Sequence, residues 1–363
     1  MRDLAWSDVQ AAVRGGSVYA SGGGGWVDHG LDIGRTAVEL GTPRLASVDE
    51  LDPDDIVITV SAIGAPAAKD WQMLAEDYIQ SVRLLCEAFE GKVVGTITPQ
   101  NGCSSSINGW VQSAALGLVV VDAVGDMRAH PTGKMGSLGL AQDSSYQTIQ
   151  VAAGGRRETG AYLEVVARGS VASTANILRV ASVESGSFIT CARHPLKASF
   201  IKERAALGGI SQAMRLGQAM IEAESQGAEA VFEAIRQVGH AEVVARGKVV
   251  ENRYVTQGAF DLGSCIVEDA THKQVKLHTM NEWMAVDSAA GQRLTTYPDV
   301  ITVVSAETGL PLNVFQVVEG MEVVVLMVHK NHIPLSAGVF DASVYPEVEK
   351  AMGISIADYA LAR

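Results

Sequence analysis

The chain has 363 residues, of which 47% are hydrophobic and 19% are charged, a composition typical of a globular protein rather than a disordered or fibrous one. Its 41 acidic and 28 basic side chains give a formal net charge of −13, which argues against a nucleic-acid partner because the phosphate backbone would be repelled. The N-terminal residues lack the continuous apolar stretch of a signal peptide, and no apolar run reaches the length of a membrane span. We therefore expect a cytoplasmic protein with no membrane partner.

The first part of the chain alternates predicted helices and strands. Ser7 and Gln10 have capping-box spacing, and the glycines that follow indicate a short helix over residues 6–16. A brief strand is expected next, leading into the four glycines Gly22 to Gly25. The apolar patterns then predict, in order, a strand at 54–66, a helix at 69–91, a strand at 92–98, a helix at 107–117 and a strand at 118–126. This alternation predicts an α/β domain with a largely parallel sheet.

The pattern changes after residue 150. A polar, glycine-containing stretch at 151–160 is followed by helical periodicity over 202–239 and by strand-like alternation over 241–269. We therefore place a boundary near residue 160. The prediction is an N-terminal α/β domain at 1–160 and a strand-rich, C-terminal α+β domain at 161–363.

Polar side chains gather in four predicted loops of the first domain. Ligands of an open parallel sheet bind beyond the carboxyl ends of its strands, where such loops converge. The candidates in these loops are Asp28, His29, Asn101, Cys103, Asp122, Asp126 and His130. The glycine run has neither the GxGxxG nor the GxxxxGK[ST] spacing, so we expect no nucleotide and favour close packing of its backbone against a ligand or a neighbouring subunit.

Cysteine and histidine allow more than one interpretation. The four cysteines are widely spaced and indicate reduced thiols rather than disulfides. Cys103 either fills a small buried space beside a helix cap or is a thiolate activated at a helix N-terminus. Cys191 and His194 have a spacing that allows both to reach one soft metal ion, although His194 could equally be a satisfied buried histidine. Adding Cys103 would make a three-ligand site with an open position.

Residues 276–287 form a predicted strand-like run that contains His278, Asn281 and Glu282 among apolar residues. These polar groups either line a site or face solvent on an alternating strand.

Seven segments, taken in this order, resemble the bacterial S-methyl thiohydantoin desulfurase family, which is associated with hydantoinase and oxoprolinase proteins. They are SGGGGWVDHG, IGAP, AALGLVVVDAVGDMRAHP, ALGGISQAMRLGQAMI, GKVVENRYVTQGAFDLG, MNEWMAVD and YPDVITVVSAETGLPL. The resemblance runs through nearly the whole chain and implies a two-part molecule. The matching positions are Gly22 to Gly25, Gly64 to Pro66, Asp122, Gly125, Arg128, Pro131, Asn281 and Glu282. The chain departs from the family pattern at Cys103 and Ser104, which stand at glycine-like positions, and at His130, where a bulky apolar residue is common.

The resemblance implies hydrolysis of a methylthio-substituted imidazolone to a hydantoin with loss of methanethiol, as in the breakdown of thiol-histidine compounds such as ergothioneine. Such a reaction needs a base for water, donors for the developing charge and a group that stabilises the departing sulfur. We expect a copper or zinc ion on Cys103, Cys191 and His194. Asp126 or His130 would then be the base, and Gly24 and Gly25 would be the donors. Asn101, Asn281 and Glu282 would help to bind the substrate.

Two alternatives remain open at this point. Without a metal, Cys103 would act as a nucleophile with a histidine as its partner. A different class of function is a non-catalytic subunit or sensor that binds hydantoin-like rings and assembles with a hydantoinase. In either case the expected ligand is a small molecule. The apolar composition also leads us to expect a homo-oligomer, with no interface identified.

Overall fold

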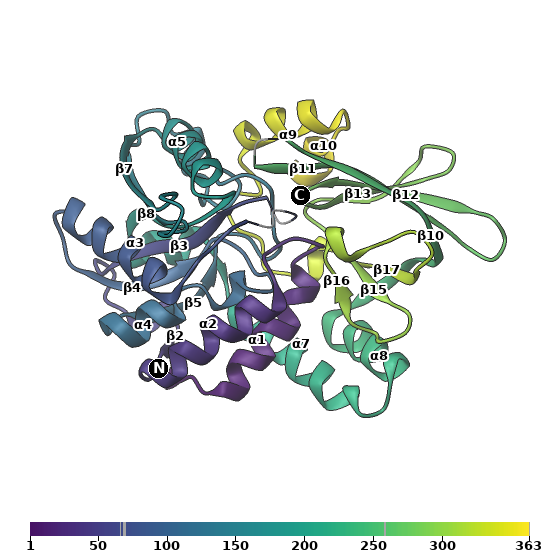
Figure 1. Cartoon of the computed structure of the whole chain (residues 1–363), viewed down its shortest axis with the longest axis horizontal. Helices are drawn as coiled ribbons and strands as arrows, with labels where there is room; N and C mark the ends of the chain where they lie inside the picture. Colours follow the sequence, from purple (N-terminus) through teal and green to yellow (C-terminus); the bar gives the residue numbers. More distant parts are fainter. Residues whose placement is uncertain (66, 68–69, 258, 363) are drawn as a thin grey trace.

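The computed structural model describes residues 1–65, 67, 70–257 and 259–362. Two β-sheets lie next to each other, with the first two helices and a later helical pair beneath them in the view of Figure 1. Pro66, which ends the predicted strand at 54–66, and Lys69, which begins the predicted helix at 69–91, lie outside the described residues.

The first sheet has a parallel centre. Its central strands are, in spatial order, β2 (Arg44–Ala46), β5 (Val119–Val124), β4 (Val93–Thr98) and β3 (Ile56–Gly64). Neighbouring strands in this group pair in parallel. Antiparallel strands extend the sheet beyond β3 in the order β8 (Phe188–Lys197), β6 (Thr148–Gly154) and β7 (Leu163–Gly169). The short strands β1 (Arg2–Asp3) and β9 (Ala206–Leu207) pair antiparallel with β2 and β5. The predicted α/β class is confirmed.

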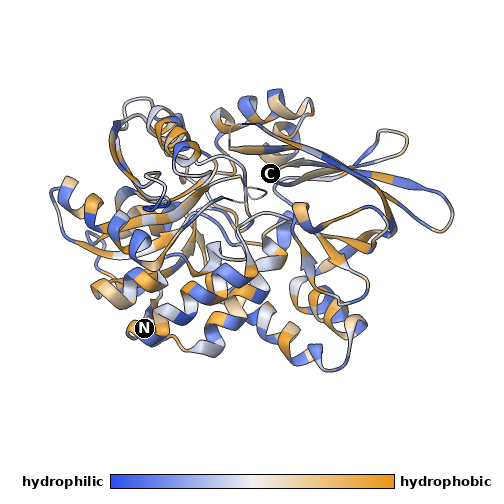
Figure 2. Cartoon of the chain, in the orientation of Figure 1, coloured by the Kyte–Doolittle hydropathy of each residue, from blue (hydrophilic) through white to orange (hydrophobic). Residues whose placement is uncertain are grey.

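Helices cover this sheet and continue the chain toward the second sheet. They are α1 (Trp6–Tyr19), α2 (Val27–Leu40), α3 (Ala75–Ala88), α4 (Trp110–Leu116), α5 (Val171–Glu184), α6 (Ala198–Arg204), α7 (Gly209–Glu224) and α8 (Ala228–Gly239). Figure 2 shows polar and apolar residues alternating around the outer helices, as expected of helices that bury one face. None of the helices in the described part of the chain is long and apolar enough to cross a membrane.

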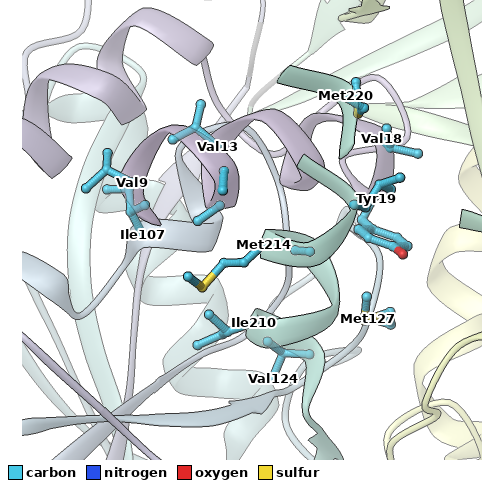
Figure 3. Packing of buried hydrophobic residues seen from close by; sticks show 14 of the residues in the cluster. Val9, Val13, Val18, Tyr19, Ile107, Val124, Met127, Ile210, Met214 and Met220 are labelled. Carbon is cyan, nitrogen blue, oxygen red and sulfur yellow. The ribbon is translucent and has the colours of Figure 1, made fainter. Parts of the chain in front are cut away.

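The first helix is longer than predicted. We expected it to end at Gly16 and a strand to follow, but α1 continues to Tyr19. Gly15 lies inside the helix and allows α1 to pack closely on α7, because a Cβ on Gly15 would lie 1.8 Å from the carbonyl oxygen of Ala213 on α7. Figure 3 shows the apolar side chains of α1 and α7 that surround this contact. The two helix backbones can approach this closely because a glycine of one helix faces a carbonyl group of the other, at Gly15 and again at Gly217.

The α1–α7 contact gives a stability prediction. Gly217 is the α7 partner in this contact, and a Cβ there would lie 1.9 Å from the carbonyl oxygen of Ala11. Gly217→Ala is therefore expected to lower the free energy of unfolding by about 2 kcal/mol or more through overpacking. Urea titration followed by circular dichroism would measure the change. Gln218→Ala, on the exposed side of the same helix, is the control and should change stability by less than about 0.5 kcal/mol. Equal midpoints for the two variants would contradict the packing role.

The second sheet is antiparallel throughout. Its spatial order is β14 (Arg293–Thr296), β13 (Glu282–Ser288), β12 (Gln274–Met280), β11 (Phe260–Glu268), β10 (Ala241–Gln257), β17 (Glu322–Val328), β15 (Val300–Ser305) and β16 (Pro311–Leu312). The chain ends in the short helices α9 (Tyr345–Met352) and α10 (Ala357–Leu361). This strand-rich second half agrees with the predicted C-terminal class.

Two sequence expectations need correction here. The single run predicted at 276–287 is a hairpin in which the chain reverses between β12 and β13 at Asn281, whose φ is +62°. Asparagine tolerates this left-handed conformation better than most residues, so it permits a tight reversal within an apolar run. The boundary predicted near residue 160 does not separate the two sheets, because β7, β8 and β9 all join the first sheet. As a division between domains, that boundary stays a prediction.

Candidate functional site

A cavity lies where the first sheet meets the β12–β13 hairpin of the second. Its volume is about 60 Å³ as measured by the space open to the centre of a water molecule. The ends or following loops of β3, β4 and β5 contribute Ser61, Ala62, Ile63, Gly64, Pro99, Gln100, His130, Pro131, Thr132 and Gly133. The other lining residues are Gly24, Gly25, Ser104, Ser105, Asn108, Arg179, Phe188, Arg193, Asn281 and Glu282. The cavity therefore lies at the carboxyl ends of three parallel strands, the usual ligand position in such a sheet.

The glycine segment connects the two halves of the site. The Gly24 carbonyl accepts hydrogen bonds from the amides of Ser104 and Ser105 at 3.1 and 3.2 Å. On the other side, the Gly25 carbonyl accepts one from the Asn313 side chain at 2.7 Å. A Cβ on Gly24 would lie 2.6 Å from the Cα of Gly102. The glycines thus let this segment pass between the loop after β4 and the second sheet while remaining at the cavity wall.

Glu282 is a carboxylic acid buried at this wall. Its side chain is 2% exposed, and its Oε2 atom has no hydrogen-bond partner among the described residues. Burial raises the pKa of Glu282 to about 8, although the charges of Arg128 and Arg179 partly oppose the shift. The preceding residue, Asn281, accepts a hydrogen bond from the Asp261 amide at 2.8 Å, which holds the turn in position. A buried carboxyl with one unpaired oxygen and a pKa near neutrality is suited to proton transfer.

Two arginines bring positive charge to the cavity. Arg193, on β8, is 3% exposed and contacts the Ser61 hydroxyl and the Cys191 sulfur, whereas its Nε atom has no partner among the described residues. Arg179, on α5, donates to the carbonyls of Ala259 and Pro131 at 3.2 and 3.1 Å. Neither arginine forms an ion pair with a carboxylate within the described part of the chain. Arg193 thus keeps one unused donor, and both arginines supply positive charge at the cavity.

His130 also lines the cavity but is held neutral. Burial lowers the pKa of His130 to about 4. Its Nε2 atom lies 3.4 Å from the carbonyl oxygen of Pro99, and its backbone amide donates to Gln100 at 3.1 Å. The Nδ1 atom is buried without a partner in the described chain. If Nε2 carries the proton and faces Pro99, Nδ1 is left as an acceptor, so His130 suits orientation of a ligand N–H group better than storage of a proton.

The structure brings together five of the predicted site residues and leaves the others away from the cavity lining. Gly24, Gly25, His130, Asn281 and Glu282 line it. The predicted base Asp126 does not: it accepts a hydrogen bond from the Tyr297 hydroxyl, and burial raises its pKa to about 6. The predicted substrate ligand Asn101 instead donates to the carbonyls of Met127 and Gly209, at 3.3 and 3.1 Å. Both side chains hold loops in place behind the cavity.

The three predicted metal ligands each have a different neighbour. Cys103 lies 3.4 Å from the Asn313 side-chain oxygen, and burial raises its pKa to about 12, which disfavours a thiolate. Cys191 lies 2.9 Å from the Ser61 hydroxyl. His194 pairs through Nδ1 with the Thr148 hydroxyl at 2.8 Å. Across the described residues, no three His, Cys, Asp or Glu side chains are grouped so as to hold a metal ion. The residues present therefore do not fit the predicted copper or zinc site.

The sequence interpretation missed both cavity arginines and the acid–base potential of Glu282. A weak signal was available, since Arg179 stands within an apolar helical run and Arg193 within an apolar strand. A charged side chain in such a position is costly to bury unless it has partners or a ligand. The pattern does not indicate which other segments these side chains face.

Comparison with known proteins identifies the family. Residues 7–159 match the family described as S-Me-THD-like, N-terminal domain, and residues 170–334 match S-Me-THD-like, C-terminal domain. The chain belongs to the S-methyl thiohydantoin desulfurase family. The predicted family is thus confirmed, and the family name implies an enzyme. A search of curated proteins gave no match.

A solved structure supports the fold of this S-Me-THD-like chain. The X-ray crystal structure of a protein from Chromobacterium violaceum superimposes with a TM-score of 0.73 over 97% of each chain, at 19% sequence identity. At this identity the likeness extends to the two-sheet fold and not to the reaction.

Proposed function

We propose that this protein hydrolyses an S-methyl thiohydantoin ring, that is, a methylthio-substituted imidazolone, to the hydantoin and methanethiol. Catabolism of thiol-histidine compounds such as ergothioneine would supply such a substrate. The family membership supports the substrate class. The single observation that carries the reaction type is Glu282, a buried carboxyl at the cavity wall whose pKa is raised to about 8 and whose Oε2 atom has no hydrogen-bond partner among the described residues.

The chemistry of the ring assigns a task to each group. Water attacks the ring carbon that bears sulfur, and Glu282 accepts the proton that the water loses. The new C–O bond places negative charge on the ring nitrogen, which Arg179 or Arg193 stabilises together with the backbone amides of the glycine segment. The C–S bond then breaks, and the proton held by Glu282 leaves with methanethiol. One water is consumed, and no oxidant or reductant is required.

No step of this proposal uses a metal ion, because Cys103, Cys191 and His194 have separate partners. Nor does it use Cys103 as a nucleophile. The thiol is 1% exposed and does not line the cavity. Cys103→Ser should therefore leave methanethiol release within a few-fold of the wild type.

Product analysis tests the proposed reaction. The purified full-length protein is incubated with a synthetic S-methyl thiohydantoin, methanethiol is trapped with a thiol reagent, and the hydantoin is identified by mass spectrometry. Water labelled with ¹⁸O should place its oxygen on the hydantoin carbon that lost sulfur. Binding of the ring without release of methanethiol would instead support a hydantoin-binding subunit and overturn the proposal.

The pH dependence of the rate follows from Glu282. As a base it acts only when ionised, and its folded-state pKa is raised to about 8. The value of kcat/KM should therefore increase as the pH rises toward about 8 and level off above it. Initial rates across this range, with substrate ionisation measured separately, check the profile. A rate that falls as pH rises through this range would show that the protonated carboxyl is the active form.

A further inference from the structure

One edge of the first sheet is left unpaired. Strand β7 (Leu163–Gly169) pairs with β6 on one side and with no strand of the described residues on the other, so it ends the sheet at the outer edge seen in Figure 1. No hydrogen bond to the outward-facing backbone groups of β7 is found among the described residues. Alternate residues of this seven-residue strand therefore present unpaired donors and acceptors, which are a template for another strand.

The charged residues of β7 are arranged so that two antiparallel copies of the strand would place opposite charges across from each other. Its sequence is LEVVARG, with exposed Glu164 and exposed Arg168 on either side of exposed Val166. Within the chain, Glu164 accepts hydrogen bonds through Oε1, and Arg168 donates to a carbonyl through one terminal nitrogen, so each side chain keeps a further polar atom for a partner. If two copies of β7 pair antiparallel about a twofold axis at Val166, Glu164 of each copy lies opposite Arg168 of the other. The interface would then hold two such pairs. Opposite charges directly across a strand pair are favourable.

Other symmetric registers lose this match. Side chains of paired residues must lie on the same face of the sheet, so the axis can move only by whole residues along the strand. An axis at Val165 places Glu164 opposite Val166, and an axis at Ala167 places Val166 opposite Arg168. The charges therefore select the register centred on Val166.

Helix α5 adds an apolar surface next to this edge. It packs on β7, and its exposed residues include Ile177 and Val180, which are 49% and 63% exposed. Arg179 of the same helix faces the cavity, which places Ile177, two residues earlier, on the opposite flank. Val166, on the face of β7 opposite to α5, is 49% exposed. Figure 2 shows apolar residues along this helix.

We propose that a second copy of this chain docks on the β7 edge, forming a twofold dimer with a continuous β-sheet, with Glu164–Arg168 pairs between copies and α5 beside the axis. No cavity residue lies on β7, so the dimer leaves the proposed catalytic groups of each copy unobstructed. Isologous pairing of this kind closes on itself, which protects both edges from further strand addition.

A charge exchange tests the interface. Sedimentation equilibrium of the full-length protein should give the mass of two copies. Arg168→Glu would place the new carboxylate of each copy opposite Glu164 of the other. The interface would then hold two repulsive pairs, and the dimer should weaken about tenfold or more. The double variant Glu164→Arg with Arg168→Glu should restore it. Within one strand these two side chains are too far apart to pair, so rescue reports a contact between copies. A monomeric wild type, or a dimer indifferent to Arg168→Glu, would overturn the proposal.

Crosslinking gives an independent test that does not depend on stability. Cys86 is the exposed native cysteine among the described residues, so the tests use Cys86→Ser as background. In this background, Val166→Cys places the new thiol at the twofold axis, where it faces the same thiol of the second copy. Mild oxidation should then give a disulfide-linked dimer. Val255→Cys, at a 66% exposed position on the second sheet, is the matched control and should stay monomeric on a non-reducing gel. Equal crosslinking of the two variants would contradict the β7 interface.

Discussion

Glu282→Gln is expected to lower kcat/KM for methanethiol release by about 10²- to 10⁴-fold, the usual contribution of a positioned acid–base group. Glutamine keeps the size of the side chain and can fill the same buried space, but it cannot accept a proton from water. Initial rates of methanethiol release measure the loss. Glu242→Gln, at an exposed position on β10, is the control and should retain wild-type rates. A Glu282→Gln enzyme with more than about a tenth of wild-type activity would exclude Glu282 as the base.

The same substitution should also reveal the raised pKa of Glu282 through the pH dependence of stability. Glu282 has a raised pKa in the folded state, so the protonated form is the one that folding favours. Its contribution is complete below the unfolded-state pKa of about 4.3. That contribution is lost as pH rises toward the folded-state value of about 8. The wild-type melting temperature should therefore fall over this interval by more than that of Glu282→Gln. Parallel melting curves would contradict the raised pKa.

Arg193→Met is expected to reduce kcat/KM by about 10²- to 10³-fold, because it removes a charged donor from the place where negative charge develops. The side chain is 3% exposed, and its Nε atom has no partner in the described chain, so its hydrogen-bonding capacity is not fully used. Arg193→Lys keeps the charge but loses the planar set of donors and should recover only part of the rate.

The matched control for Arg193 is Lys197→Met at the exposed end of the same strand. Lys197 is 60% exposed and pairs with an exposed aspartate, so its loss should leave the rate unchanged. Circular dichroism must show that the Arg193 variants are folded at the assay temperature. Wild-type rates in folded Arg193→Met would mean that Arg179 and the backbone amides are sufficient to stabilise the intermediate.

Much of the first domain could be predicted from its residues. The strands that became β3, β4 and β5 are continuous apolar runs that end at glycine, proline or polar residues, as buried parallel strands do. The error at Gly15 has a clear cause, since glycine both ends helices and permits close helix packing. Sequence spacing within α1 does not distinguish these roles, because the deciding contact is with α7, about two hundred residues later.

The metal site predicted on Cys103, Cys191 and His194 stays a prediction, and the structure gives these three side chains separate partners. Cys191 and His194 are close in sequence, but a left-handed residue at His194, with φ of +54°, changes the course of β8 between them. The two side chains consequently have different partners, Ser61 and Thr148. Residues three apart in a strand also point to opposite faces, so a short spacing by itself does not predict shared ligation.

The amino-acid sequence by itself determined the family, the α/β character of the first part and the loops at the strand ends, because these depend on local patterns and motif order. Only the tertiary structure decided that Glu282, Arg179 and Arg193 share one cavity, while Cys103 and Asp126 are buried behind it. The pKa of Glu282 depends on removal of water by the glycine segment and by neighbours from the first sheet and α5. Periodicity states which side of its own element a residue occupies, but it does not state what lies opposite.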